Sequence, residues 1–125
     1  MNITRQLRIG NRDDFTPAKL QYIADHFKIS NANACLFALH WEYGISGKPF
    51  GNFQLKGAGM SKTIFLYFSK AQLDHAEETA RYYGISLIQL AKRAIKDVAQ
   101  QIEAETLEDY HPTVRAFFKW GPTND

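Results

Sequence analysis

Hydrophobic and polar positions are most clearly patterned in the second half of the chain. Residues 62–68 are mostly β-branched or aromatic and contain no breaker, which predicts a strand. Ser69 and Gln72 follow at the spacing of a capping box, in which the serine caps a new helix and the glutamine reaches back to it. We expect this helix to run to Tyr83 and to stop at Gly84, which adopts a left-handed turn conformation easily.

A second helix is predicted directly after this turn. Ser86 and Gln89 repeat the capping-box spacing. The apolar residues that follow recur at alternating steps of three and four, which places them on one helical face: Ile88, Ala91, Ile95, Val98 and Ile102. The segment therefore predicts a strand followed by two capped helices.

The first half of the chain begins with a similar order of elements. Alternation over residues 3–9 predicts a short strand with Leu7 and Ile9 on one face. The other face carries Thr4, Gln6 and Arg8.

Two helices are expected after this strand. Thr16 is the predicted N-cap of the first, with proline at the first helical position, and the helix covers Pro17–Phe27. Ser30 is expected to cap the second helix, Asn31–Tyr43. Residues 34–41 are apolar on nearly every side, so this helix should lie at the centre of a core.

The two halves correspond at an offset of 56 residues, which sets residues 24–30 against residues 80–86. Both segments end in Ile-Ser, and both lead into an apolar helix. The repeated order of strand, cap, helix, Ile-Ser and apolar helix indicates a diverged internal duplication. The first half has Lys28 where the second has Gly84, so its turn departs from the pattern.

These observations predict four segments. They are a first copy over residues 1–43, a linker over 44–60, a second copy over 61–105, and an acidic and aromatic tail over 106–125. The linker assignment depends on six glycines or prolines among residues 44–60.

The composition, 45% hydrophobic and 14% aromatic, is sufficient for a packed core. No apolar run is long enough to span a bilayer, and the first residues do not resemble a signal peptide, so we expect a cytoplasmic protein without membrane association. Cys35 is the only cysteine, which excludes an internal disulfide and a multi-cysteine zinc site.

Charge is distributed unevenly along the chain. Residues 1–102 carry 13 Lys and Arg against 8 Asp and Glu, whereas residues 103–125 carry 2 against 5. A basic body with an acidic tail fits a polyanion-binding domain with a C-terminal appendage. Ordinary surface variation is the alternative explanation.

The second half resembles the ribbon-helix-helix family of Arc, MetJ and CopG-type DNA-binding proteins. The matching features are the strand Lys62–Phe68, the helix start Ser69–Leu73, the turn Gly84–Ser86 and the pair Ala94–Ile95. The resemblance implies that two strands pair antiparallel into a ribbon that enters the DNA major groove.

Two copies in one chain are similar in plan to tandem TraY-like and VirC2-like plasmid-transfer proteins. The strand near Leu7 is then expected to pair with the strand near Leu66, within one chain or between two chains. The predicted fold is mainly α with a short two-stranded antiparallel β-ribbon, a duplicated ribbon-helix-helix that forms a pseudo-dimer.

The resemblance also implies that the outward face of the ribbon contacts bases. The candidates are Thr4, Gln6 and Arg8 in the first copy and Thr63, Phe65 and Tyr67 in the second. Arginine pairs bidentately with guanine and glutamine with adenine. A solvated strand face is the alternative. The outward aromatic residues either contact thymine methyl groups, stack on another group, or show that the strand parity is reversed.

Phosphate contacts are expected at the starts of the second helices, where unpaired N–H groups and the helix dipole attract anions. The candidates are Ser30, Asn31, Ser86 and Leu87, with Arg5, Lys28 and Lys62 close by. Simple helix capping is the alternative role of the serines.

No motif indicates an enzyme. The histidines lack metal-ligand spacing, Cys35 lies in a run expected to be buried, and no glycine-rich phosphate loop is present. We expect no catalytic residues, no metal and no cofactor.

These patterns lead us to expect a non-enzymatic protein that binds double-stranded DNA as a transcriptional repressor or as a plasmid-transfer (relaxosome) accessory factor. The alternative is a protein-binding adaptor or antitoxin-like module without DNA contact. That module would dock on a partner, or on a second copy, through Phe117, Phe118 and Trp120 of the tail.

Overall fold

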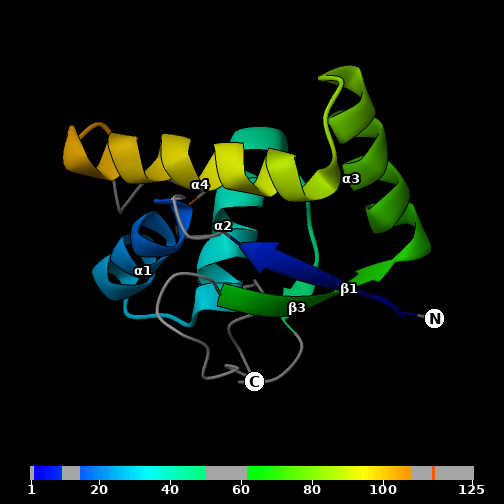
Figure 1. Cartoon of the computed structure of the whole chain (residues 1–125), viewed down its shortest axis with the longest axis horizontal. Coiled ribbons are helices and arrows are strands. Elements are labelled where there is room, and N and C mark those ends of the chain that lie inside the picture. Colours follow the sequence, from blue (N-terminus) through cyan, green and yellow to red (C-terminus); the bar gives the residue numbers. More distant parts are fainter. Residues whose placement is uncertain (1, 10–14, 50–61, 108–113, 115–125) are drawn as a thin grey trace.

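The computed structural model describes residues 2–9, 15–49, 62–107 and 114 (Figure 1). The elements are β1 (Asn2–Ile9), α1 (Thr16–Phe27), α2 (Asn31–Tyr43), β2 (Lys48–Pro49), β3 (Lys62–Ser69), α3 (Lys70–Tyr82) and α4 (Leu87–Glu103). The prediction of a mainly helical fold with a small antiparallel sheet is confirmed. None of the described helices combines the length and the hydropathy that a membrane span needs.

The sheet has the strand order β1-β3-β2. β1 and β3 pair antiparallel, from Asn2 opposite Ser69 to Ile9 opposite Lys62, as predicted for the ribbon. The pairing lies within one chain, an arrangement that the sequence left open. The expected linker contributes β2 to the other edge of β3, with Pro49 opposite Leu66. A proline has no N–H to donate, which suits it to the outer edge of a sheet.

Side-chain caps fix the starts of three helices. Both predicted capping boxes are confirmed, at Ser69–Gln72 for α3 and at Ser86–Gln89 for α4. The Ser30 hydroxyl accepts the N–H of Asn33 at 3.1 Å and caps α2, also as predicted. For α1 the prediction is wrong by one residue, because Phe15 is the N-cap and the helix already begins at Thr16.

The two interhelical turns contain the same hydrogen bond at the offset of 56. The N–H of Ile29 donates to the carbonyl of Ala24 at 2.9 Å, and the N–H of Ile85 donates to the carbonyl of Ala80 at 3.0 Å. The residue before each isoleucine is left-handed, Lys28 with φ 58° and Gly84 with φ 70°. Lys28 therefore adopts the conformation that a glycine adopts in the second turn, in spite of its Cβ atom.

Helix α2 lies at the centre of the core. Its residues 34–39 are at most 1% exposed, as its apolar sequence predicts. Helix α4 crosses α2 (Figure 1) and buries Ala91, Ile95, Val98 and Ile102. The Gln101 side chain joins the two helices, because it accepts from Trp41 Nε1 at 2.9 Å and donates to Glu42 Oε1 at 3.3 Å.

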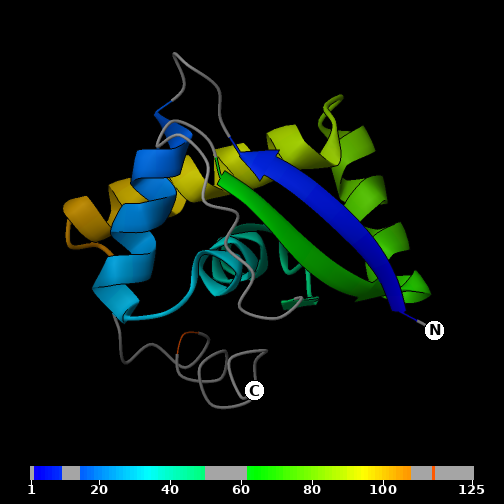
Figure 2. The same ribbon diagram turned by 60° about the horizontal axis from the view of Figure 1, so that its bottom comes forward.

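The outer helices α1 and α3 pack differently. Helix α1 lies against α2 and α4, whereas α3 lies against α4 and the strands β1 and β3. Figure 2 shows β1 and β3 in front of the central helices, with α1 on one side and α3 on the other. The C-terminal half of α3 consequently extends away from the sheet and leaves space beside the end of α2.

Candidate nucleic-acid interface

The alternation of β1 produces one buried and one exposed face. Leu7 and Ile9 are 4% and 0% exposed and belong to the core. Thr4, Gln6 and Arg8 are exposed, as the alternation predicts. The outward face of β1 therefore presents a hydroxyl, an amide and a guanidinium in a row, which are groups that form hydrogen bonds with base edges.

The parity of β3 is also as predicted. Ile64, Leu66 and Phe68 are at most 3% exposed and face the core, so the alternative of a reversed parity is wrong. The register sets Thr4 opposite Tyr67, Gln6 opposite Phe65 and Arg8 opposite Thr63. Directly opposed residues of an antiparallel pair share a face, so these six positions belong to the outward face of the ribbon. The side chains of Lys62, Thr63 and Phe65 lie outside the described part of the structure.

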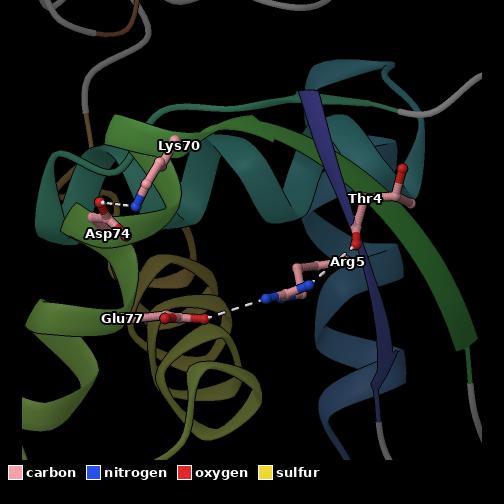
Figure 3. A network of polar contacts seen from close by, with 5 residues as sticks. All are labelled: Thr4, Arg5, Lys70, Asp74 and Glu77. Atoms are coloured by element: carbon pink, nitrogen blue, oxygen red, sulfur yellow. Dashed lines mark hydrogen bonds and ion pairs between the residues drawn. The ribbon is translucent and has the colours of Figure 1, made fainter. Parts of the chain in front are cut away.

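Arg5 lies on the face of β1 opposite to Thr4, Gln6 and Arg8, and its side chain forms an ion pair with Glu77 of α3 (Figure 3). Its Nη2 atom is 3.5 Å from Glu77 Oε1, and its Nη1 donates to the backbone carbonyl of Thr4 at 3.5 Å. Lys70 and Asp74 form a separate ion pair on α3, also at 3.5 Å. Arg5 opposes Leu66 across the ribbon, so the structure separates it from Arg8 and does not bring it to the outward face.

The predicted phosphate contacts lie at two helix starts with different exposure. At α4, Ser86 is exposed and Leu87 is half-buried. At α2, Lys28 is exposed and Ser30 is half-buried, whereas Asn31 is only 5% exposed and has little surface to offer a ligand. The serine side chain accepts one first-turn N–H in each helix, and the other first-turn N–H groups have no partner within the helix.

A second feature of the surface escaped the sequence analysis. An open groove with about 500 Å³ of free volume lies between the end of α2 and the C-terminal half of α3. It is lined by Glu42, Tyr43, His75, Glu78, Thr79, Tyr82 and Tyr83. The consecutive tyrosines before Gly84 were the available signal in the sequence.

Cys35 lies inside the core, where solvent does not reach its side chain. Burial raises the pKa of the Cys35 thiol to about 12, so this cysteine is a core residue, as predicted. Among the described residues, His, Cys, Asp and Glu form no cluster of three or more that suits a metal ion. Phe117, Phe118 and Trp120 of the tail lie outside the described residues, although Val114 is buried.

Comparison of the chain with protein-family models, with curated proteins and with solved structures found no match. The candidate interface is therefore described from the geometry of this chain alone. At about 3.3 Å per residue, Thr4 to Arg8 cover roughly 13 Å of strand, which is comparable with a major groove about 12 Å wide.

Proposed function

We propose that this chain is a sequence-specific double-stranded DNA-binding protein that inserts the β1–β3 ribbon into the major groove. The observation that carries the proposal is the register of the ribbon, which sets Thr4, Gln6 and Arg8 on the face opposite the core. Arg8 would bind guanine bidentately and Gln6 adenine, each contributing about 1–3 kcal/mol of discrimination between bases.

We propose further that the two halves are diverged copies that form a pseudo-dimer. Three observations support this: the same element order, the same turn hydrogen bond at an offset of 56, and the pairing of β1 with β3. The different packing of α1 and α3 marks where the copies have diverged.

Phosphate contacts in this proposal come from the start of α4, at Ser86 and Leu87, and from Ser30 with Lys28 at the start of α2. Backbone N–H groups and the helix dipole supply the attraction. Arg5 would stabilise the position of α3 through Glu77 instead of contacting a phosphate. The role as a repressor or as a relaxosome accessory factor rests on the resemblance to tandem ribbon-helix-helix proteins alone.

The test is selection of a preferred site from a pool of random duplexes, followed by fluorescence anisotropy titrations at increasing salt. We expect affinity to fall steeply between about 50 and 200 mM salt, because each neutralised phosphate releases counterions. The variant Arg8→Ala should bind the selected site about 5- to 150-fold more weakly and lose its base preference at one position. Gln6→Ala should lose the base preference at a different position of the selected site.

Lys96→Ala is the matched control, because it removes one positive charge from the exposed side of α4. It should change the affinity little and leave the preferred sequence unchanged. Circular dichroism establishes that each variant keeps its helices. Absence of binding at low salt, or equal losses in Arg8→Ala and Lys96→Ala, would contradict the proposal and favour the protein-binding alternative.

A further inference from the structure

The groove beside α3 combines aromatic rings with negative charge. Tyr82 is 83% exposed and Tyr83 is 43% exposed, which is unusual for large side chains at the end of a helix. Their ring centroids are 5.0 Å apart at an interplanar angle of 88°, and the rings of Tyr43 and Tyr83 are 5.5 Å apart at 60°. Rings at such angles present their faces in several directions, and the face of an aromatic ring attracts cations.

One of these rings already receives a guanidinium from the same chain. The Cζ atom of Arg93, on α4, lies 4.9 Å from the centroid of the Tyr83 ring. Arg93 is exposed, so its contact with the Tyr83 ring forms at the protein surface and not in the core. The contact shows that the ring cluster accepts the geometry of an arginine side chain.

Carboxylates from three helices surround the rings. Glu42 on α2 and Glu78 on α3 line the groove. Asp97 on α4 lies close enough to Glu42 for its negative charge to affect the pKa of the Glu42 carboxyl. Burial, followed by repulsion from Asp97, raises the pKa of the Glu42 carboxyl. The other titratable groups at this groove are His75, Tyr43, Tyr82, Tyr83 and Arg93. A cation placed here would relieve the repulsion between Glu42 and Asp97, whereas an anion would increase it.

We propose that this groove binds the Lys or Arg side chain of a basic peptide segment presented by a partner protein. Charge complementarity and the tyrosine faces select an organic cation, and the described residues offer no cluster suited to a metal ion. The groove is open along the surface, so a peptide backbone can continue past the bound side chain. The proposal does not rest on DNA binding, because the groove involves none of the outward ribbon residues.

The test uses two acetylated and amidated Gly/Ser nonapeptides that differ only at the central residue, arginine in one and citrulline in the other. Citrulline keeps the shape of arginine but has no charge. Titration of the ¹⁵N-labelled full chain, without DNA, should shift the amide signals of Tyr43, Tyr82 and Tyr83 with the arginine peptide at millimolar concentration. The citrulline peptide should leave these signals unshifted over the same range.

Three variants show whether each side chain strengthens or weakens binding of the arginine peptide. Glu78→Gln and Tyr82→Ala remove a carboxylate and an exposed ring, and each should weaken binding about two- to five-fold. Arg93→Gln removes the cation that competes for the Tyr83 ring, so it should strengthen binding of the arginine peptide. Glu103→Gln, an equal change of charge at the far end of α4, is the control and should have no effect.

The proposal is overturned by any of three results. Equal shifts with arginine and citrulline would show that charge is not recognised. Equal losses in Glu78→Gln and Glu103→Gln would show only diffuse attraction to a negative surface. Weaker binding in Arg93→Gln would show that Arg93 supports the site instead of competing with the ligand. None of these results depends on whether the ribbon binds DNA.

Discussion

Replacing Lys28 by glycine should stabilise the protein. Lys28 follows α1 with φ 58° and ψ 50°, in the left-handed region. A residue with a Cβ atom loses roughly 1–2 kcal/mol there, because Cβ approaches the following carbonyl oxygen. Glycine avoids this loss, but it also makes the unfolded chain more flexible. The added flexibility offsets about 0.4–1 kcal/mol of the gain in stability. The net expectation for Lys28→Gly is a free energy of unfolding higher by about 0.5–1 kcal/mol.

The second turn provides the reciprocal variant. Gly84 has φ 70°, and a Cβ atom built on it meets nothing within 4 Å, so Gly84→Ala tests the backbone conformation without a steric clash. We expect a destabilisation of similar size, about 0.5–1 kcal/mol. Lys28→Ala is the control for the lost charge, since alanine keeps the Cβ atom.

Urea unfolding followed by circular dichroism measures all three variants. At an m-value of about 1.5 kcal/mol/M, Lys28→Gly should raise the midpoint by about 0.3–0.7 M, and Gly84→Ala should lower it by a similar amount. Lys28→Ala should remain close to the wild type. If Lys28→Gly unfolds at the same urea concentration as Lys28→Ala, or earlier, left-handed strain at Lys28 is refuted.

Two further predictions concern the core. A Cβ atom on Gly47 would lie 2.8 Å from Phe68 Cε1 and 3.0 Å from the Tyr67 carbonyl oxygen, so Gly47→Ala should cost about 1–3 kcal/mol in urea unfolding. An unchanged midpoint would show that the Phe68 ring moves aside freely. Cys35 should resist iodoacetamide at pH 8 in the native protein and react once the chain unfolds, as mass spectrometry would show. Because burial raises its pKa from 9.0 to about 12, Cys35 contributes stability that is full below pH 9 and is lost between pH 9 and 12. Rapid native alkylation would contradict the burial.

Local signals in the sequence predicted the helices and the faces of the strands well. The capping boxes at Ser69 and Ser86 are short-range patterns whose hydrogen bonds form within four residues, so they need no tertiary information. The alternation of β1 similarly determined which residues face the core. The pairing of β1 with β3 was predicted only through the resemblance to a known family, and the register came from the structure.

Other features depend on contacts between distant segments. The strand β2 has two residues, one of them proline, and no local pattern distinguishes it from a loop. Its position follows from the close approach of Gly47 to Phe68. The groove of tyrosines arises because α3 packs on the strands instead of on α2, and this choice of partner is a tertiary property. The conformation of Lys28 could not be predicted from its residue type, because a residue with a Cβ atom disfavours the left-handed region that Lys28 adopts. A backbone hydrogen bond from Ile29 to Ala24 closes this turn.

Because β1 and β3 pair inside one chain, formation of the ribbon does not depend on protein concentration, and each strand can change in sequence independently. A ribbon built from two identical chains forms only when they associate, so its stability depends on protein concentration. Here the two strands are parts of the same molecule, and the ribbon forms in a unimolecular step at any dilution. A substitution in β1 also changes one strand only, whereas in a homodimer it changes both. The two strands of this ribbon are thus free to diverge in sequence, and under the proposed DNA-binding function the recognised site need not be symmetric.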